Sequence, residues 1–274
     1  MDKIPVCLQD LRSIRDMMSL KGKTAVVTGA AGGIGRSTAS ALAEMGANVA
    51  LMDIPEKLPL LDEIAGFIRE RHGSKAMTVT GNVADEVSVR SFYDAIVRDF
   101  GTVDIVHNNA GVATPDDNTD MDLSVWKRML DINYTGMLIV AREAARVMKA
   151  HKHGGSIIFT SSMSGHIINR RPADVRYSIT YTSTKAAVMQ LAKAMAMDYV
   201  GDDIRVNSIS PGYVLSGLHD NTPDDKVEYM ASQIPMQRFG TLNEIIGAVV
   251  YLASDLGSYH TGSDILIDGG YCVW

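Results

Sequence analysis

Tyr181 and Lys185 lie four residues apart in the stretch Tyr-Thr-Ser-Thr-Lys, at the start of a segment with a helical pattern. Residues at i and i+4 share one helix face, so the lysine ammonium can lie close to the phenol. A phenol with its ordinary pKa of about 10 is a poor base at neutral pH, and a neighbouring cation lowers that pKa. The pair is therefore a candidate acid and base for removing a proton from an alcohol. Tyr177 is a competing tyrosine, but no lysine follows it at the same spacing.

A glycine-rich turn, TGAAGGIG, occupies residues 28–35 directly after an apolar, β-branched stretch. Its glycines Gly29, Gly33 and Gly35 follow the spacing G-x-x-x-G-x-G, with Ile34 between the last two. Glycine allows a sharp turn and lets a phosphate approach the main chain, and the helix that follows offers free N–H groups. The turn predicts a dinucleotide-binding site; the alternative is a tight strand-to-helix turn with no ligand.

Asp53 follows Gly33 by 20 residues and ends the second predicted strand. An acidic residue at about this distance accepts hydrogen bonds from an adenosine ribose, and its charge repels a 2′-phosphate. The glycine turn itself contains no lysine or arginine. We therefore expect NAD rather than NADP as the cofactor; the alternative is that Asp53 only caps the loop before Pro55.

These groups need a scaffold, and short apolar stretches alternate with helical patterns along the chain. This alternation predicts right-handed crossovers and a doubly wound parallel α/β sheet (a Rossmann fold) in one domain, residues 21–274, preceded by an N-terminal extension, residues 1–20. The expected strands are 24–28, 48–52, 76–80, 103–107, 155–160, 204–209 and 264–268. The expected helices are 34–45, 57–71, 85–100, 122–150, 181–200 and 241–254.

The composition favours a globular protein and argues against several function classes. The formal net charge of −6 disfavours nucleic acid or an anionic membrane surface as a partner. No apolar run approaches the roughly 20 residues of a membrane span, and the N-terminal stretch lacks the apolar core of a signal peptide. Cys7 and Cys272 form no disulfide framework, and the seven histidines suggest no metal-ligand set. We expect a cytoplasmic protein with no metal.

Six motifs in a fixed order make the chain resemble the short-chain dehydrogenase/reductase family from Leu20 to its end. They are the turn at 28–35, NNAG at 108–111, Asn133 within DINYTG, Ser161-Ser162, Tyr181 with Lys185, and Ser210-Pro211-Gly212. Several independent motifs in register are far more specific than any one of them.

The resemblance implies a catalytic set. Tyr181 matches the family's acid/base, and Lys185 matches the residue that lowers the tyrosine pKa and binds the nicotinamide ribose. Ser162, with Gly165 three residues later, matches the serine that binds the substrate oxygen. Asn133 matches an asparagine that positions a water behind the lysine; the alternative is that it ties two backbone segments together.

The resemblance also implies cofactor contacts. Asn109, Ala110 and Gly111 match the segment beside the adenosine, while Pro211, Gly212 and Val214 match the loop that holds the nicotinamide amide. Two positions depart from the usual pattern: Asn82-Val83 stands where the family has Asp-Val, and Ser216 stands where threonine is common. An amide oxygen and a hydroxyl keep the hydrogen-bonding capacity, so we expect both departures to be mild.

The segment between Ser162 and Tyr181 is longer than is usual for the family. The expected insertion, residues 166–180, borders the substrate and contains Arg170, Arg171 and Arg176, which we expect on a solvated loop face. The stretch SSMSGHIINR and the ending DGGYCVW resemble the branch that interconverts sugar alcohols and ketoses. A steroid or bile-acid alcohol and a 3-oxoacyl thioester remain alternatives.

The resemblance implies a homotetramer, with the apolar helix after Tyr181 in one interface. The apolar tail, Tyr271 to Trp274, is hypothesised to pack at a subunit interface. Two other function classes compete with an NAD-dependent oxidoreductase acting on a small alcohol or ketone. A sugar-nucleotide epimerase or dehydratase would have a longer C-terminal substrate region, and a non-catalytic dinucleotide sensor would lack the tyrosine or the lysine.

Overall fold

A seven-stranded parallel sheet forms the centre of the computed structural model, which describes residues 11–171, 175–217 and 222–273. The strand order among these residues is β3-β2-β1-β4-β5-β6-β7, and every neighbouring pair is parallel. The strands are β1 (Thr24–Thr28), β2 (Asn48–Asp53), β3 (Ala76–Thr80), β4 (Ile105–Asn108), β5 (Gly155–Thr160), β6 (Ile204–Pro211) and β7 (Asp264–Ile267). The predicted doubly wound α/β fold is confirmed.

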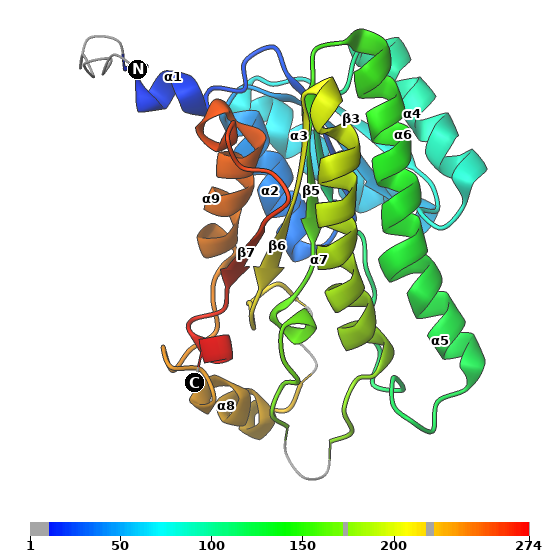
Figure 1. The fold of residues 1–274 in the computed structure, drawn as a ribbon, viewed down its shortest axis with the longest axis vertical. Helices are drawn as coiled ribbons and strands as arrows, with labels where there is room; N and C mark the ends of the chain where they lie inside the picture. The colour runs from blue at the N-terminus through cyan, green and yellow to red at the C-terminus, as the bar shows by residue number, and fades with distance from the viewer. Residues whose placement is uncertain (1–10, 172–174, 218–221, 274) are drawn as a thin grey trace, which may run out of the picture.

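Helices cover both faces of the sheet (Figure 1). They are α1 (Ile14–Met18), α2 (Gly33–Glu44), α3 (Leu58–His72), α4 (Glu86–Phe100), α5 (Leu123–Leu130), α6 (Gly136–His151), α7 (Thr180–Tyr199), α8 (Asp224–Ser232) and α9 (Leu242–Ala253). One core cluster joins α4, α6 and α7 to the sheet, and the other joins α2, α3 and α9. Alternate residues of β1 feed the two clusters, as Val26 faces one and Val27 the other.

The order of the strands reverses next to β1, which pairs with β2 on one side and β4 on the other. Ligands of such sheets bind outside the carboxyl ends of the strands at this reversal. Helix α8 and the C-terminus lie beyond the carboxyl ends of β6 and β7 (Figure 1). Late parts of the chain therefore lie beside this edge of the sheet.

The prediction of one regular helix over 122–150 is wrong. This stretch contains α5, then a π-helical turn over Asp131–Thr135, and then α6. π-turns inside helices occur frequently at functional sites, and this one contains Asn133. The short helices α1 and α8 were not predicted; neither buries a side chain fully, so neither has a strong apolar pattern. No helix among the described residues is both long enough and apolar enough to cross a bilayer.

Candidate functional site

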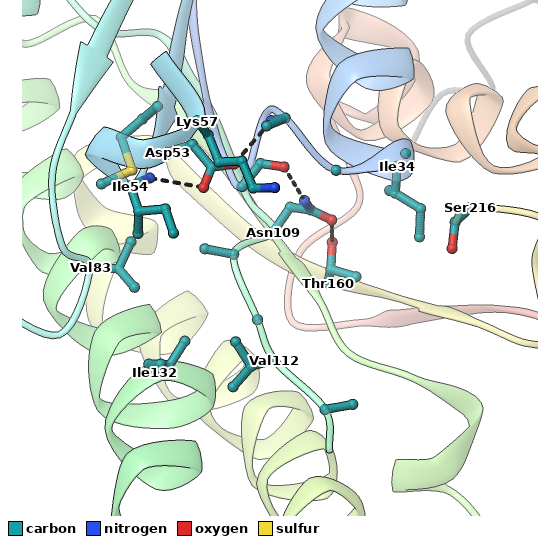
Figure 2. A pocket seen from close by; sticks show the side chains of 18 of the residues that line it. Ile34, Asp53, Ile54, Lys57, Val83, Asn109, Val112, Ile132, Thr160 and Ser216 are labelled. Atoms are coloured by element: carbon teal, nitrogen blue, oxygen red, sulfur yellow. Dashed lines mark hydrogen bonds between the residues drawn. The ribbon is translucent and has the colours of Figure 1, made fainter. Parts of the chain in front are cut away.

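A cleft of about 640 Å³ opens at the carboxyl ends of the strands where their order reverses (Figure 2). This volume lies in the range of small-molecule sites. The predicted residues that line it are Gly29, Gly33, Ile34, Asp53, Asn82, Val83, Asn109, Ala110, Gly111, Tyr181, Lys185 and Ser216. The predicted residues that do not line it are Gly35, Asn133, Ser162, Pro211, Gly212 and Val214.

The glycines of the turn let two other backbone segments approach it closely, because they lack side chains. Gly29 has φ +64°, and a Cβ built there would lie 2.9 Å from the Ala110 Cα. A Cβ on Gly33 would lie 2.2 Å from the Ser216 carbonyl oxygen. Gly33 is also the first residue of α2, whose N–H groups suit a phosphate. This cradle fits the pyrophosphate of a dinucleotide.

Gly35 has a different role, because the backbone of the turn itself fills the space where its side chain would lie. A Cβ on Gly35 would lie 2.2 Å from the carbonyl oxygen of Gly29. The missing side chain therefore lets helix α2 pack onto the turn, and this explains why Gly35 does not line the cleft.

Asp53 lies at the end of β2, and backbone donors fix its carboxylate. Its Oδ2 accepts from the Ala31 N–H at 3.0 Å, and its Oδ1 accepts from the Ile54 N–H at 2.8 Å. Lys57 lines the same end of the cleft (Figure 2), and Arg36 lines the cleft too. The sequence analysis missed these two cations because it considered basic residues only within the glycine turn.

A buried polar chain joins the glycine turn to the end of β5. The Asn109 Nδ2 donates to the Thr28 carbonyl at 3.2 Å, and the Thr160 hydroxyl donates to the Asn109 Oδ1 at 3.1 Å. The Nε2 of His107 lies 2.8 Å from the same hydroxyl, and burial lowers the His107 pKa to about 3. Because this imidazole is neutral, it can donate to Thr160 without adding charge beneath the cofactor. Thr160 lines the cleft and was not predicted.

Tyr181, Lys185 and Ser162 come together at one end of the cleft. Helix α7 places Tyr181 and Lys185 one turn apart, with the lysine Nζ 5.6 Å from the tyrosine ring centroid. The ammonium donates to the Thr160 carbonyl at 2.7 Å. Ser162, which follows β5, is hydrogen-bonded to the Tyr181 hydroxyl and accepts from the Ser164 N–H at 3.1 Å. The predicted arrangement of hydroxyl, phenol and ammonium is present.

Two influences act on the pKa of Tyr181 within the polypeptide. Burial is the larger and raises the pKa of Tyr181, while the hydrogen bond with Ser162 lowers it and only partly compensates. Burial also lowers the pKa of Lys185 to about 8. Ser162 is thus one group that favours the phenolate, and the lowering of the tyrosine pKa by Lys185 stays a prediction.

Asn133 lies beside this group and is fully buried. Its Oδ1 accepts from the Val112 N–H, and its Nδ2 donates to the Val112 carbonyl, both at 2.8 Å. A Cβ on Gly111 would lie 3.3 Å from the Asn133 Oδ1 and 3.5 Å from the Lys185 Nζ, so glycine lets both side chains approach this backbone. Asn133 thus ties the loop after β4 to the π-turn. Its part in a water relay stays a prediction.

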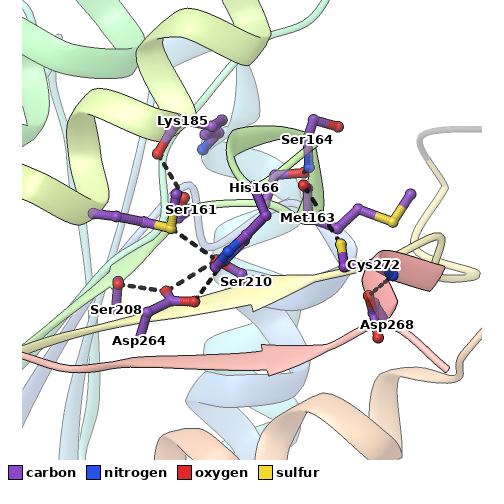
Figure 3. A network of polar contacts seen from close by, with 12 residues as sticks. Ser161, Met163, Ser164, His166, Lys185, Ser208, Ser210, Asp264, Asp268 and Cys272 are labelled. Atoms are coloured by element: carbon purple, nitrogen blue, oxygen red, sulfur yellow. Dashed lines mark hydrogen bonds and ion pairs between the residues drawn. The ribbon is translucent and has the colours of Figure 1, made fainter. Parts of the chain in front are cut away.

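A second polar network ties the segment after Ser162 to the edge of the sheet (Figure 3). The His166 Nε2 lies 2.9 Å from the Asp264 Oδ2, and the Ser210 hydroxyl donates to the other carboxylate oxygen at 2.9 Å. Ser161 donates to the Lys185 carbonyl at 2.7 Å and so ties the end of β5 to α7. Sequence reasoning gave His166 and Asp264 no role.

The loop after Ser210 packs inward rather than lining the cleft. A Cβ on Gly212 would lie 2.7 Å from the Asp268 Cα, and Val214 is buried. Only Ser216 of the predicted loop residues reaches the cleft surface. Direct contacts of Pro211, Gly212 and Val214 with the cofactor stay predictions.

Aromatic side chains meet beyond the carboxyl ends of β6 and β7. The Tyr213 hydroxyl accepts from the Asn169 Nδ2 at 3.0 Å, and burial raises the Tyr213 pKa to about 12. The Tyr271 hydroxyl accepts from the Arg170 N–H at 2.8 Å, and its ring lies edge-on to Tyr213. Tyr271 is only 3% exposed within its own chain, so no second subunit is needed to cover it. Trp274, the other aromatic of the tail, lies outside the described residues.

The two described ends of the inserted segment contact other parts of the chain. Arg171 donates to the Ser178 hydroxyl at 2.9 Å, and Arg176 pairs with Asp120 at 2.8 Å. Residues 172–174 lie outside the described part. Among the described residues no group of three or more His, Cys, Asp or Glu side chains could hold a metal ion.

Comparisons with known proteins agree with this geometry. A family model described as enoyl-(acyl carrier protein) reductase matches residues 29–272. A sorbose reductase from Candida albicans is 38% identical, with 94% of this chain and 90% of the relative covered. An NADP-dependent mannitol dehydrogenase from Alternaria alternata is 37% identical, with 98% and 100% covered. A crystal structure of a short-chain type dehydrogenase/reductase from Mycobacterium marinum has a TM-score of 0.87 and 40% identity, with 96% and 100% covered.

The matched region includes the glycine turn, the Ser162–Tyr181–Lys185 group, and the rings of Tyr213 and Tyr271. Members of the matched family use a nicotinamide dinucleotide, which the glycine cradle fits. The chain belongs to the short-chain dehydrogenase/reductase family and is an oxidoreductase that acts on CH–OH groups with a nicotinamide dinucleotide.

Proposed function

We propose that this protein interconverts a sugar alcohol and its ketose with NAD(H). The observation that carries the proposal is one cleft with the Ser162–Tyr181–Lys185 group at one end and the fixed carboxylate of Asp53 at the other. The first end supplies proton transfer next to a hydroxyl donor. The second end suits the two hydroxyls of an adenosine ribose.

The residues of the chain divide the chemistry between them. A bound nicotinamide supplies hydride transfer to or from the carbinol carbon. In oxidation, the Tyr181 phenolate takes the proton from the alcohol oxygen as that oxygen becomes a carbonyl. Ser162 donates a hydrogen bond that steadies negative charge on the same oxygen. In reduction, Tyr181 returns the proton to the oxygen. Lys185 provides positive charge beside the Tyr181 ring in both oxidation and reduction.

A polyol or ketose is the proposed substrate class. Relatives that cover nearly the whole chain are named for sorbose and mannitol, and the segments after Ser162 and at the C-terminus resemble that branch.

The preference for NAD over NADP rests on Asp53. Its carboxylate is held by two backbone N–H groups, so it cannot readily turn away from a 2′-phosphate. Two features oppose this preference: Arg36 and Lys57 line the same cleft, and four relatives are named as NADP-dependent or probable NADP-dependent mannitol dehydrogenases. We give Asp53 more weight because it ends β2, where the ribose of a dinucleotide is bound in such sheets.

The test is a steady-state assay that follows the absorbance of the reduced nicotinamide. Mannitol, sorbitol, xylitol, gluconate and a bile acid are tested with NAD and with NADP. Fructose, sorbose and a 3-oxoacyl thioester are tested with the two reduced cofactors. We expect turnover of one polyol–ketose pair with a higher kcat/KM for NAD. Turnover with NADP alone would contradict the role of Asp53. Turnover only of a bile acid or a 3-oxoacyl thioester would contradict the substrate class.

Assembly as a homotetramer is part of the same proposal. Helix α7 carries outward apolar side chains at its end: Met197 is 65% exposed and the adjoining Val200 is 53% exposed in the single chain. Light scattering on the purified protein tests this, with four chain masses expected. A single chain mass at assay concentrations would contradict it.

A further inference from the structure

Asp117 is a buried carboxylate that the proposed chemistry does not use. It lies in the loop between β4 and α5 and is only 2% exposed. Its Oδ1 accepts from the Thr180 N–H at 2.8 Å, and its Oδ2 accepts from the Tyr181 N–H at 2.9 Å. Both oxygens therefore bind the first two backbone N–H groups of α7, the helix that carries Tyr181.

Helix α7 needs this contact because its own sequence provides no cap. The residue before it, Ile179, has no side-chain acceptor for the exposed N–H groups of the first turn. The hydroxyls of Thr182 and Ser183 point the other way and donate to the Ile179 carbonyl. A carboxylate also matches the positive end of the helix dipole. The cap is thus supplied from a distant part of the chain.

The loop that carries Asp117 is itself anchored to the cofactor cleft. Its first residues, Val112 and Ala113, line the cleft, and Asn133 holds Val112 through two hydrogen bonds. Beyond Asp117, Asp120 pairs with Arg176 on the surface. The loop is therefore held by hydrogen bonds at Val112 beside the cleft and at Asp117 beside the backbone of Tyr181.

We propose that Asp117 is a positioning residue that holds Tyr181 within hydrogen-bonding distance of Ser162. This proposal rests on the proposed role of Tyr181 as acid and base. Asp117 does not touch the substrate, because its side chain is buried and does not line the cleft. It acts through the first turn of α7. Without it, that turn can fray, and the phenol can move away from Ser162 and from the cleft.

The test compares Asp117→Ala and Asp117→Asn with the control Asp120→Asn. The control removes a charge from the same loop, but at an exposed residue whose ion pair lies on the surface. We expect kcat to fall about tenfold to 100-fold for Asp117→Ala, as misplaced catalytic groups do, with the dissociation constant of NADH unchanged. Asp117→Asn keeps the shape and one acceptor oxygen, so its loss should be smaller. The control should match the wild type.

The pH profile separates positioning from plain stabilisation. The charged and polar groups that face Tyr181 are Lys185 on its own helix, Ser162 after β5, and Asp117 at its backbone N–H. Burial raises the Tyr181 pKa and the Ser162 hydrogen bond lowers it, so movement of the phenol changes that pKa. The limb of kcat/KM for alcohol oxidation that reports Tyr181 should therefore move in Asp117→Ala and stay in place in Asp120→Asn. Hydrogen exchange of residues 176–185 should speed up, while exchange of β1 stays the same.

Each result decides between the alternatives. A lower melting temperature with unchanged kcat and an unchanged pH profile would overturn the proposal, because Asp117 would then only stabilise the fold. Failure of both variants to fold would overturn it for the same reason. Tyr181→Phe is measured alongside: if it retains turnover, the proposed role of Tyr181 fails. If it is inactive while Asp117→Ala is fully active, the positioning role alone fails.

Discussion

The two ends of the site are held together in different ways. At the cofactor end, the turn after β1 is closed by its own backbone, as Gly32 donates to the Gly29 carbonyl at 3.1 Å. At the substrate end, side chains from distant parts of the sequence meet. His166 pairs with Asp264, and the Arg170 N–H binds the Tyr271 hydroxyl. The first end depends on the absence of side chains, and the second depends on their presence.

This difference has consequences for substitution. An added methyl group in the glycine turn meets backbone, which cannot move without shifting two segments. A side chain removed at the substrate end leaves a backbone or hydroxyl group unpaired but does not block the cleft. Changes at the cofactor end should therefore affect affinity for the dinucleotide, and changes at the other end should affect turnover or stability.

After Tyr181 itself, the largest expected effect is on Ser162, which belongs to the substrate end and does not line the cofactor cleft. Ser162→Ala should lower kcat about 100-fold to 1,000-fold, because it removes a donor to the reacting oxygen. It also removes the hydrogen bond that lowers the Tyr181 pKa, so the rising limb of the oxidation profile should shift to higher pH. Ser183→Ala, at an exposed hydroxyl of α7, is the control. Weakened NADH binding in Ser162→Ala would contradict the division between the two ends.

The next effect is on the glycine turn. Gly33→Ala should weaken NADH binding by about tenfold or more, since overpacking costs about 1–3 kcal/mol. The new Cβ would lie 2.2 Å from the Ser216 carbonyl oxygen. Gly66→Ala in α3, where nothing lies within 4 Å, is the control and should bind NADH normally. Titration of NADH fluorescence measures the affinity of both variants for NADH. Equal affinities would contradict the conclusion that the glycine turn at the cofactor end controls dinucleotide binding.

A smaller change is expected at Asp53, where charge rather than shape matters. Asp53→Asn should raise the kcat/KM ratio of NADP to NAD about fivefold to tenfold, which corresponds to roughly 1 kcal/mol of charge repulsion. Lys57→Gln, which removes a cation from the same end of the cleft, should move the ratio the other way. A ratio unchanged in Asp53→Asn would show that the carboxylate does not select the cofactor.

The smallest effect concerns the stability of the substrate end. Tyr271→Phe leaves the Arg170 N–H without its acceptor and should lower the free energy of unfolding by about 1 kcal/mol. Tyr177→Phe, at a half-exposed ring, should change it little. Urea unfolding measures both variants. An equal loss in the two would mean that the Tyr271 hydroxyl does not hold the inserted segment.

The same contrast explains what could be predicted from sequence. The strands, the glycine turn and Asp53 have local signals, because a short β-branched stretch, a spacing of glycines and a following acid lie close together in the chain. Asp117 has no such signal: it stands among several aspartates in one polar loop, and only folding brings it to α7. Tyr213 and Tyr271 likewise meet only in the folded chain. The rise that burial causes in the Tyr181 pKa was not predicted either, because burial has no local signature.

The most direct test of the account is to measure binding and turnover on one preparation of Tyr181→Phe. The substitution removes the hydroxyl that transfers the proton and leaves the glycine turn and Asp53 untouched. We predict that NADH binds as tightly as it does to the wild type, while turnover of the polyol–ketose pair falls about 100-fold to 10,000-fold. Substantial residual turnover, or a loss of NADH affinity that matches the loss of turnover, would contradict the separation of cofactor binding from proton transfer.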